Sequence, residues 1–259
     1  MAPQRSLKVL WTVASKVGVR NLGRVVSSLV SQYYDTVLFF REDLHPGVQG
    51  SVALTIDDGL CRNGAGRALV AEVRQLLKQH EARATFFVCS RYLTGLEAEA
   101  RGLLEDGHEF GNHMTHDTHK YPGVPAEEFE ADLQACTAAI EALSEEGAPA
   151  GSGRVTWFRA PGGKLTDSMS SVIRRHGLRH ALGDCYCDDW AIEDPAFIAR
   201  TLLAQANSGS VVILHMPERG FREHCLEALS QLLQGLSARG LRCVTLTALA
   251  AAAGAPAPG

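Results

Sequence analysis

The feature that most constrains the fold is a regular alternation of short β-type runs with amphipathic helical stretches. The helical stretches fall within residues 66–80, 126–144, 167–176, 195–207 and 223–239. The β-type runs are SVALTI, RATFFVC, GHEFGNH, VTWFRAP, LRHALGDCY, SVVILH and LRCVTL. Because parallel strands need long crossover connections and helices supply them, the alternation predicts an α/β fold with a parallel sheet, most simply a closed or nearly closed barrel.

The chain has 259 residues, which suits one barrel-sized domain, and no linker or internal repeat divides it. We expect a basic helical extension at 1–45, the barrel domain at 46–250 and a disordered low-complexity tail at 251–259. The extension fits an amphipathic helix packed on the domain, but also an organelle transit peptide or a membrane-surface helix. Lysines interrupt its apolar run, which makes a poor secretory signal, so the compartment stays open.

Charge and cysteine content narrow the range of partners. The first 34 residues carry five basic residues and no acidic one, whereas the net charge of the whole chain is −4, so the remainder carries −9. An acidic main domain argues against nucleic acid as a partner. No run of about 18 apolar residues is present that could span a membrane. The seven cysteines lack C-x-x-C pairs and fall mostly in apolar segments, which is typical of reduced core thiols; the oligomeric state is not indicated.

Polar residues gather where the predicted strands end. Asp57 and Asp58 end the first run, and two adjacent carboxylates there are costly unless a partner or a metal ion offsets their desolvation. Neighbouring residues of an extended chain point in different directions, so one carboxylate can bind a cation while the other handles a proton. The other reactive side chains at strand ends or in adjoining loops are His113, Arg159, Asp189 and His215. Since this end of a parallel barrel builds the active site, the pattern predicts a catalytic site.

Five short motifs, in chain order, resemble those of the polysaccharide deacetylase family, the NodB homology domain. TIDDG resembles the first motif, usually T-F-D-D-G, and GHEFGNH resembles the run into the second. FRAPGG is similar to the third motif, R-x-P-x-G, while DDW is similar to the fourth and VVILH to the fifth. These matches extend over about residues 50–248. The resemblance implies a distorted (β/α)7-type barrel with parallel strands.

The resemblance also implies one divalent metal ion, zinc by default, bound by Asp58, His113 and Asp117 beside Asp57 as the general base. The family normally has a second histidine four residues after the first, and Asp117 occupies that position here. An aspartate oxygen binds zinc well, so a set of one imidazole and two carboxylates is chemically sound. His116 could replace Asp117 if the loop is rearranged.

A general acid and two supporting side chains complete the expected catalytic set. By the resemblance, His215 protonates the leaving amine. Asp189 could hold its ring and raise its pKa, as a neighbouring carboxylate does. Arg159 could hold Asp57 ionised and oriented through a bidentate bond.

Three residues are expected to contact substrate. By the resemblance, Leu214 would line a pocket for the acetyl methyl group. Pro161 belongs to the third motif and is followed by glycines that permit close approach of substrate. Trp190 is either a wall of a sugar-binding groove or an ordinary core residue.

Residues and resemblance together predict a metal-dependent hydrolase that removes acetyl groups from N-acetylated amino sugars, most simply N-acetylglucosamine in chitin-like or peptidoglycan-like material. The expected partner is therefore a carbohydrate substrate. Two alternatives stay open: a non-catalytic carbohydrate-binding protein on the same scaffold, and an amidohydrolase that acts on a small cyclic amide.

Overall fold

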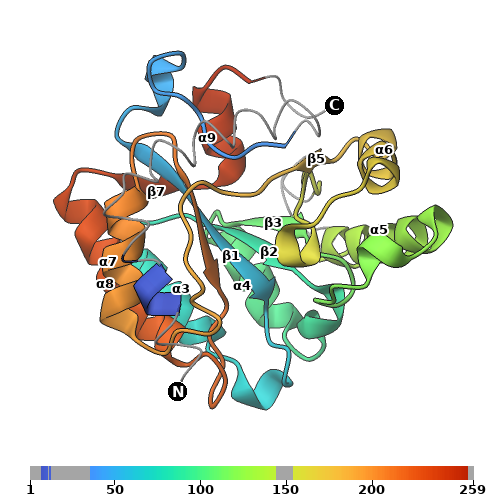
Figure 1. The fold of residues 1–259 in the computed structure, drawn as a ribbon. Coiled ribbons are helices and arrows are strands. Elements are labelled where there is room, and N and C mark those ends of the chain that lie inside the picture. Colours follow the sequence, from blue (N-terminus) through green and yellow to red (C-terminus); the bar gives the residue numbers. More distant parts are fainter. Residues whose placement is uncertain (1–6, 11, 13–35, 144–153, 256–259) are drawn as a thin grey trace.

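A parallel sheet forms the centre of the protein (Figure 1). The computed structural model describes residues 7–10, 12, 36–143 and 154–255. The sheet has the strand order β5-β4-β3-β2-β1-β6, and β7 pairs with the start of β1. The strands are β1 (Ser51–Gly59), β2 (Thr85–Val88), β3 (Glu109–Asn112), β4 (Trp157–Phe158), β5 (Arg179–His180), β6 (Val211–His215) and β7 (Arg242–Val244).

One segment before β1 helps to bring the two edges of the sheet together. Val37 bridges Ala181, just beyond β5, and Phe39 bridges Ser210, just before β6. The sheet is thus curled into a half-barrel, and the predicted α/β fold with a distorted, parallel barrel is confirmed. Residues 36–40 take part in this closure, so residues that we assigned to the extension at 1–45 belong to the barrel.

Helices cover the outside of the curled sheet. Figure 1 shows α7 and α8 together on one side and α5 with α6 on the other, and each of these pairs is in contact. The sequence did not predict α4, which contains Gly102, or α9, whose alanine-rich sequence has no polar face. The helices are α3 (Val70–Gln79), α4 (Glu97–Glu105), α5 (Ala126–Glu141), α6 (Asp167–Arg175), α7 (Pro195–Gln205), α8 (His224–Ala238) and α9 (Leu246–Ala252).

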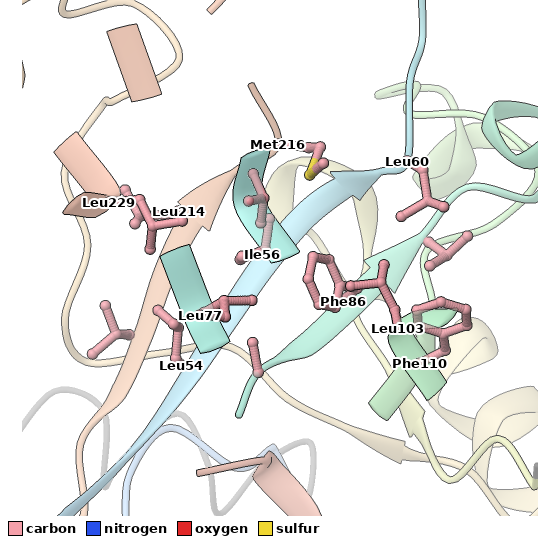
Figure 2. Close-up of a cluster of buried hydrophobic side chains, with 14 of the residues drawn as sticks. Leu54, Ile56, Leu60, Leu77, Phe86, Leu103, Phe110, Leu214, Met216 and Leu229 are labelled. Atoms are coloured by element: carbon pink, nitrogen blue, oxygen red, sulfur yellow. The ribbon is translucent and has the colours of Figure 1, made fainter. Parts of the chain in front are cut away.

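The alternation of side chains along β1 separates the core from the site. Leu54 and Ile56 point toward the helices and join Leu77 of α3 and Leu229 of α8 in a fully buried apolar cluster (Figure 2). Thr55 and the residues in step with it point to the opposite face of the strand, into the barrel. The core therefore fixes which side chains of β1 reach the interior.

We expect Leu77→Ala to lower the free energy of unfolding by about 2–5 kcal/mol, because Leu77 is completely buried and its removal leaves a cavity. Urea denaturation monitored by circular dichroism measures this change. Leu76→Ala, on the half-buried face of the same helix, is the matched control and should cost clearly less. Equal losses in the two variants would contradict this assignment of the core face.

The chain ends differ from expectation in one respect. Residues 7–10 are helical, and Nζ of Lys8 lies 2.7 Å from Oδ2 of Asp194, the residue that caps α7. Ala251 and Ala252 belong to α9 and Ala253 is buried, so the predicted tail at 251–259 begins too early.

The rest of the predicted extension and residues 256–259 lie outside the described residues. Among the helices that are described, none has the length and hydropathy needed to cross a bilayer.

Candidate active site

A pocket of about 690 Å³ opens where the parallel strands end. Its walls come from segments far apart in the chain, which the parallel topology brings to one edge of the sheet. Of the predicted site residues, those that line it are Asp57, Asp58, His113, Asp117, Arg159, Trp190 and His215. Asp189 lies behind this wall, fully buried, against His215.

Both aspartates of β1 line this pocket because the backbone turns at the second one. Asp58 has φ 59°, and the pairing of β1 with β2 loses register between Ile56 and Gly59. The left-handed conformation costs a non-glycine residue about 1–2 kcal/mol. The two carboxylates nevertheless have different partners: Asp57 contacts Arg159, whereas Asp58 faces His113.

Asp58, His113 and Asp117 form the candidate metal centre. One potential ligand atom from each lies within 4.8 Å of the others. Nδ1 of His113 donates to the carbonyl oxygen of Arg159 at 2.7 Å, so that Nε2 presents its lone pair to Oδ1 of Asp58, 3.6 Å away. Nδ1 of His116, in contrast, lies 3.1 Å from Oγ1 of Thr115. The geometry therefore favours Asp117 over His116 as the third ligand.

These three residues fit a divalent cation. An imidazole nitrogen held by a carbonyl oxygen and two carboxylates is a donor set that zinc and similar ions accept. Burial alone would raise the pKa of Asp58, but the positive charges of His215, Arg222 and Arg62 hold that pKa below its ordinary value. Asp58 is thus available as an anionic ligand at neutral pH.

Arg159 donates hydrogen bonds both to Asp57 and to the backbone of the segment that follows β5. Its Nη1 donates to Oδ1 of Asp57 at 2.5 Å and to Oγ1 of Thr55 at 2.8 Å. Its Nε and Nη2 donate to the carbonyl oxygens of Ala181 and Leu182, each at 3.0 Å. The predicted bidentate bond to Asp57 is therefore wrong, because the remaining donors of this buried guanidinium hold the chain beyond β5 instead.

His215 is held by the buried carboxylate of Asp189. Nδ1 of His215 lies 2.9 Å from Oδ1, and the backbone N–H of His215 donates to Oδ2 at 2.8 Å. Burial would lower the pKa of His215, but the carboxylates of Asp189, Asp58 and Asp57 outweigh it and raise this pKa to about 9. The imidazole therefore carries its proton at neutral pH, and the pairing inferred from sequence is present.

Two arginines at this site were not predicted from the sequence. Arg62 follows β1 and Arg222 precedes α8; both line the pocket and both donate to Oδ2 of Asp58. Arg222 has φ 54°, a further left-handed residue at the site. Charged residues in loops give no periodic signal, although the spacing of four between Asp58 and Arg62 permitted an ion pair.

Two expected substrate contacts are placed elsewhere. Leu214 lies in the apolar cluster beneath the helices and does not line the pocket, whereas its neighbour Ile213 does (Figure 2). The reason is strand alternation: Ile213 shares the inward face with His215, and Leu214 takes the other face. Pro161 is buried, and the pocket wall at this point is formed by the glycines that follow it.

Exposed aromatic residues form the rim of the pocket. Trp190 is 53 % exposed and Tyr186 is 48 % exposed, and both line the opening. Trp190 is therefore not an ordinary core residue. His119 also lines the pocket, with its ring against Gly162.

The cysteines and the buried His108 have structural roles. The cysteines are unpaired and buried, and burial raises the pKa of Cys185 and Cys225 well above that of an ordinary thiol. His108 accepts from the backbone N–H of Ala84, and burial lowers its pKa to about 4. These groups are thus kept neutral in the core.

Fold and site together define a parallel α/β barrel whose strand ends carry a candidate metal centre, an arrangement typical of metal-dependent hydrolases. The sequence profile of polysaccharide deacetylases matches residues 45–181. The chain belongs to the polysaccharide deacetylase family, whose members depend on a metal ion.

Proteins similar in sequence to this chain are named as deacetylases. A chitooligosaccharide deacetylase of Azorhizobium caulinodans is 29% identical over 202 residues, which cover 74% of this chain and 90% of that protein. A peptidoglycan-N-acetylglucosamine deacetylase of Bacillus cereus is 28% identical over 207 residues, covering 79% of this chain and 90% of that one.

Solved structures confirm the fold. The peptidoglycan N-acetylglucosamine deacetylase Bc1960 superposes with a TM-score of 0.70 at 20% identity, covering 84% of this chain and 94% of that chain. A Bacillus anthracis pseudoenzyme of carbohydrate esterase family 4 superposes with a TM-score of 0.64 at 20% identity, covering 78% and 65%. The scaffold is thus shared by active and inactive proteins, so function must be argued from the site.

Proposed function

We propose that this protein is a metal-dependent hydrolase that removes acetyl groups from N-acetylated amino sugars, with N-acetylglucosamine in chitin-like or peptidoglycan-like polymers or oligomers as substrate. The observation that carries the proposal is the meeting in one pocket of Asp57, the Asp58–His113–Asp117 centre and the imidazole of His215, which Asp189 holds from behind. The names of the similar deacetylases support the substrate class.

In this proposal Asp58, His113 and Asp117 would hold the ion, with zinc as the expected metal. When bound, a divalent ion supplies Lewis acidity, which lowers the pKa of water and polarises the amide carbonyl. Asp57 accepts a proton from the attacking water through Oδ2, because Oδ1 is already engaged by Arg159. Arg159 is a positioning residue that keeps this carboxylate ionised and aimed.

His215 then donates its proton to the nitrogen of the leaving amine, which an amide requires because an amide anion is a poor leaving group. Asp189 acts through His215 by holding the ring and stabilising its charged form. Proton acceptor and proton donor thus stand on neighbouring strands, since Asp57 and His215 are register partners of β1 and β6.

The lining of the pocket also suits a sugar. The exposed rings of Trp190 and Tyr186 offer faces on which pyranose rings stack at the rim. Ile213 and Leu182 supply apolar surface further inside, where the acetyl methyl group would lie. We propose Ile213 in place of Leu214 for this contact.

A non-catalytic carbohydrate-binding protein is the second candidate. The observation that favours it is the bond from Arg62 to Asp117, which places a side-chain cation on a proposed metal ligand. Release of acetate from N-acetylglucosamine oligomers by the zinc-loaded protein tests the two candidates directly. Zinc binding with no acetate release from any oligomer length would leave the binding protein as the better account.

We expect Asp117→Ala to lose most of its bound zinc, because the variant removes one of three protein ligands. His116→Ala should keep wild-type zinc content, and it is the matched control from the same loop. Metal content is measured by plasma emission spectrometry after dialysis against a fixed zinc concentration. The reverse result, with zinc lost only in His116→Ala, would show that the loop supplies a different ligand.

A further inference from the structure

Two arginines contact the carboxylates of the candidate metal centre in different ways. Oδ2 of Asp58 accepts from Nη1 of Arg222 at 2.5 Å and from Nη2 of Arg62 at 3.1 Å. Nη2 of Arg62 also donates to Oδ2 of Asp117, so that one guanidinium bridges both carboxylate ligands. Oδ1 of Asp58 instead faces Nε2 of His113.

We infer that Arg62 is a resident cation of the metal-free site, and that a divalent ion must displace its guanidinium from Asp117 in order to bind. Arg62 thereby sets the metal affinity of this protein. The inference rests on the proposed function, because it takes Asp58, His113 and Asp117 as the ligands of the ion.

The position of Arg62 is built by several other residues. Its backbone N–H donates to Oε1 of the buried Glu218 at 2.7 Å, and the next residue, Asn63, donates twice to Oε2 of the same side chain. Its guanidinium carbon lies 5.5 Å from the centre of the Tyr92 ring and 5.8 Å from that of Phe221. Two aromatic faces and two carboxylates therefore hold this cation, which is an arrangement that stabilises a desolvated guanidinium.

The same geometry distinguishes Arg62 from Arg222. Among the three proposed ligands, Arg222 contacts Asp58 alone, through Oδ2, so a metal ion can take Oδ1 of Asp58 while Arg222 stays in place. Arg62 is different, because its Nη2 contacts both Asp58 and Asp117 and so occupies the space between the two carboxylates that an ion would bridge. The side chain of Arg62 is 29% exposed and that of Arg222 only 9%, so Arg62 is the one with room to swing away.

Charge explains why such a cation is useful. Two carboxylates whose oxygens approach within 4.8 Å repel one another unless a positive charge lies between them. A guanidinium in this position holds the ligands close together in the absence of the ion, yet it competes with the ion for the same oxygens. The metal-free protein should accordingly be more stable with Arg62, and the metal should bind more tightly without it.

Zinc titration of the metal-stripped full chain by calorimetry, together with thermal unfolding with and without zinc, tests the inference. Arg62→Gln should bind zinc about ten- to a hundredfold more tightly than wild type, since a charge-assisted bond no longer opposes the ion. Its melting temperature without zinc should fall by several degrees. Arg62→Lys keeps the charge but not the planar fork, and should fall between the two.

Arg91→Gln is the matched control, because it removes an equal charge from an exposed side chain next to Tyr92 in sequence. An equal gain in affinity in this control would reduce the effect to net charge and overturn the inference. Equal zinc affinity of wild type and Arg62→Gln would overturn it while leaving the proposed function intact. Absence of zinc binding in both proteins would overturn the inference and the proposed metal centre together.

Discussion

Asp57→Asn is expected to lower kcat on N-acetylglucosamine oligomers by at least about 100-fold while zinc stays bound. The physical reason is that an amide cannot accept the proton of the attacking water, and removal of a general base typically costs two to four orders of magnitude. Asp57 is not one of the three clustered ligand residues, so the metal content should not change. Acetate release and metal analysis on the same preparation measure both quantities.

Folding must be checked in this variant, because Arg159 is buried and would lose its anionic partner. An unpaired buried charge is costly, although Asn can still accept a hydrogen bond from the guanidinium, and the retained bonds to Thr55, Ala181 and Leu182 limit the loss. Asp188→Asn is the matched control, since Asp188 lines the same pocket and the chemistry gives it no role. Zinc loss in Asp57→Asn with residual turnover preserved would exchange the roles of the two aspartates.

The path of the main strands could be predicted from sequence for a physical reason. A run such as SVALTI, buried on both faces, can lie only between other strands and helices, and the helices between such runs impose parallel pairing. Segments with short or irregular strand pairing were harder to predict. The run from Leu178 to Tyr186 yields only two strand residues, Arg179–His180, because the chain beyond them makes isolated bridges instead of a regular ladder.

The residues of the candidate site likewise fall into those that the sequence could predict and those that it could not. Residues at strand ends could be found because strand direction fixes their position, and Ile213 was available from the alternation that places His215 inward. The choice between His116 and Asp117 depends on the path of the loop after β3, and apolar patterning does not reveal irregular backbone such as the left-handed residue Met114, with φ 66°. Arg62 and Arg222 lie 160 residues apart and come together because the strands that they follow, β1 and β6, pair side by side in the sheet.

Loss of the general acid His215 is the second change expected to have a large effect on turnover. His215→Gln should reduce turnover of an unactivated acetamide by about 100-fold or more, since no acid then protonates the leaving amine. Wild-type turnover in that variant would remove His215 from the mechanism. In the metal-free protein the neighbouring carboxylates raise the pKa of His215 to about 9. A bound cation would offset the charge of Asp58 and should therefore lower the pKa of His215 toward neutral pH.

Asp189→Asn should move the alkaline limb of the kcat/KM profile to lower pH by about one unit or more, because the lost carboxylate favoured the charged ring. The same sign applies to stability. A pKa raised in the folded protein stabilises the fold fully at pH values below the ordinary value of His and ceases to do so as pH rises through about 9. The difference in unfolding free energy between wild type and Asp189→Asn should therefore shrink over that range. A purely structural role for Asp189 would lower stability at every pH and leave the alkaline limb where it was, and this outcome would contradict the pairing as a catalytic device.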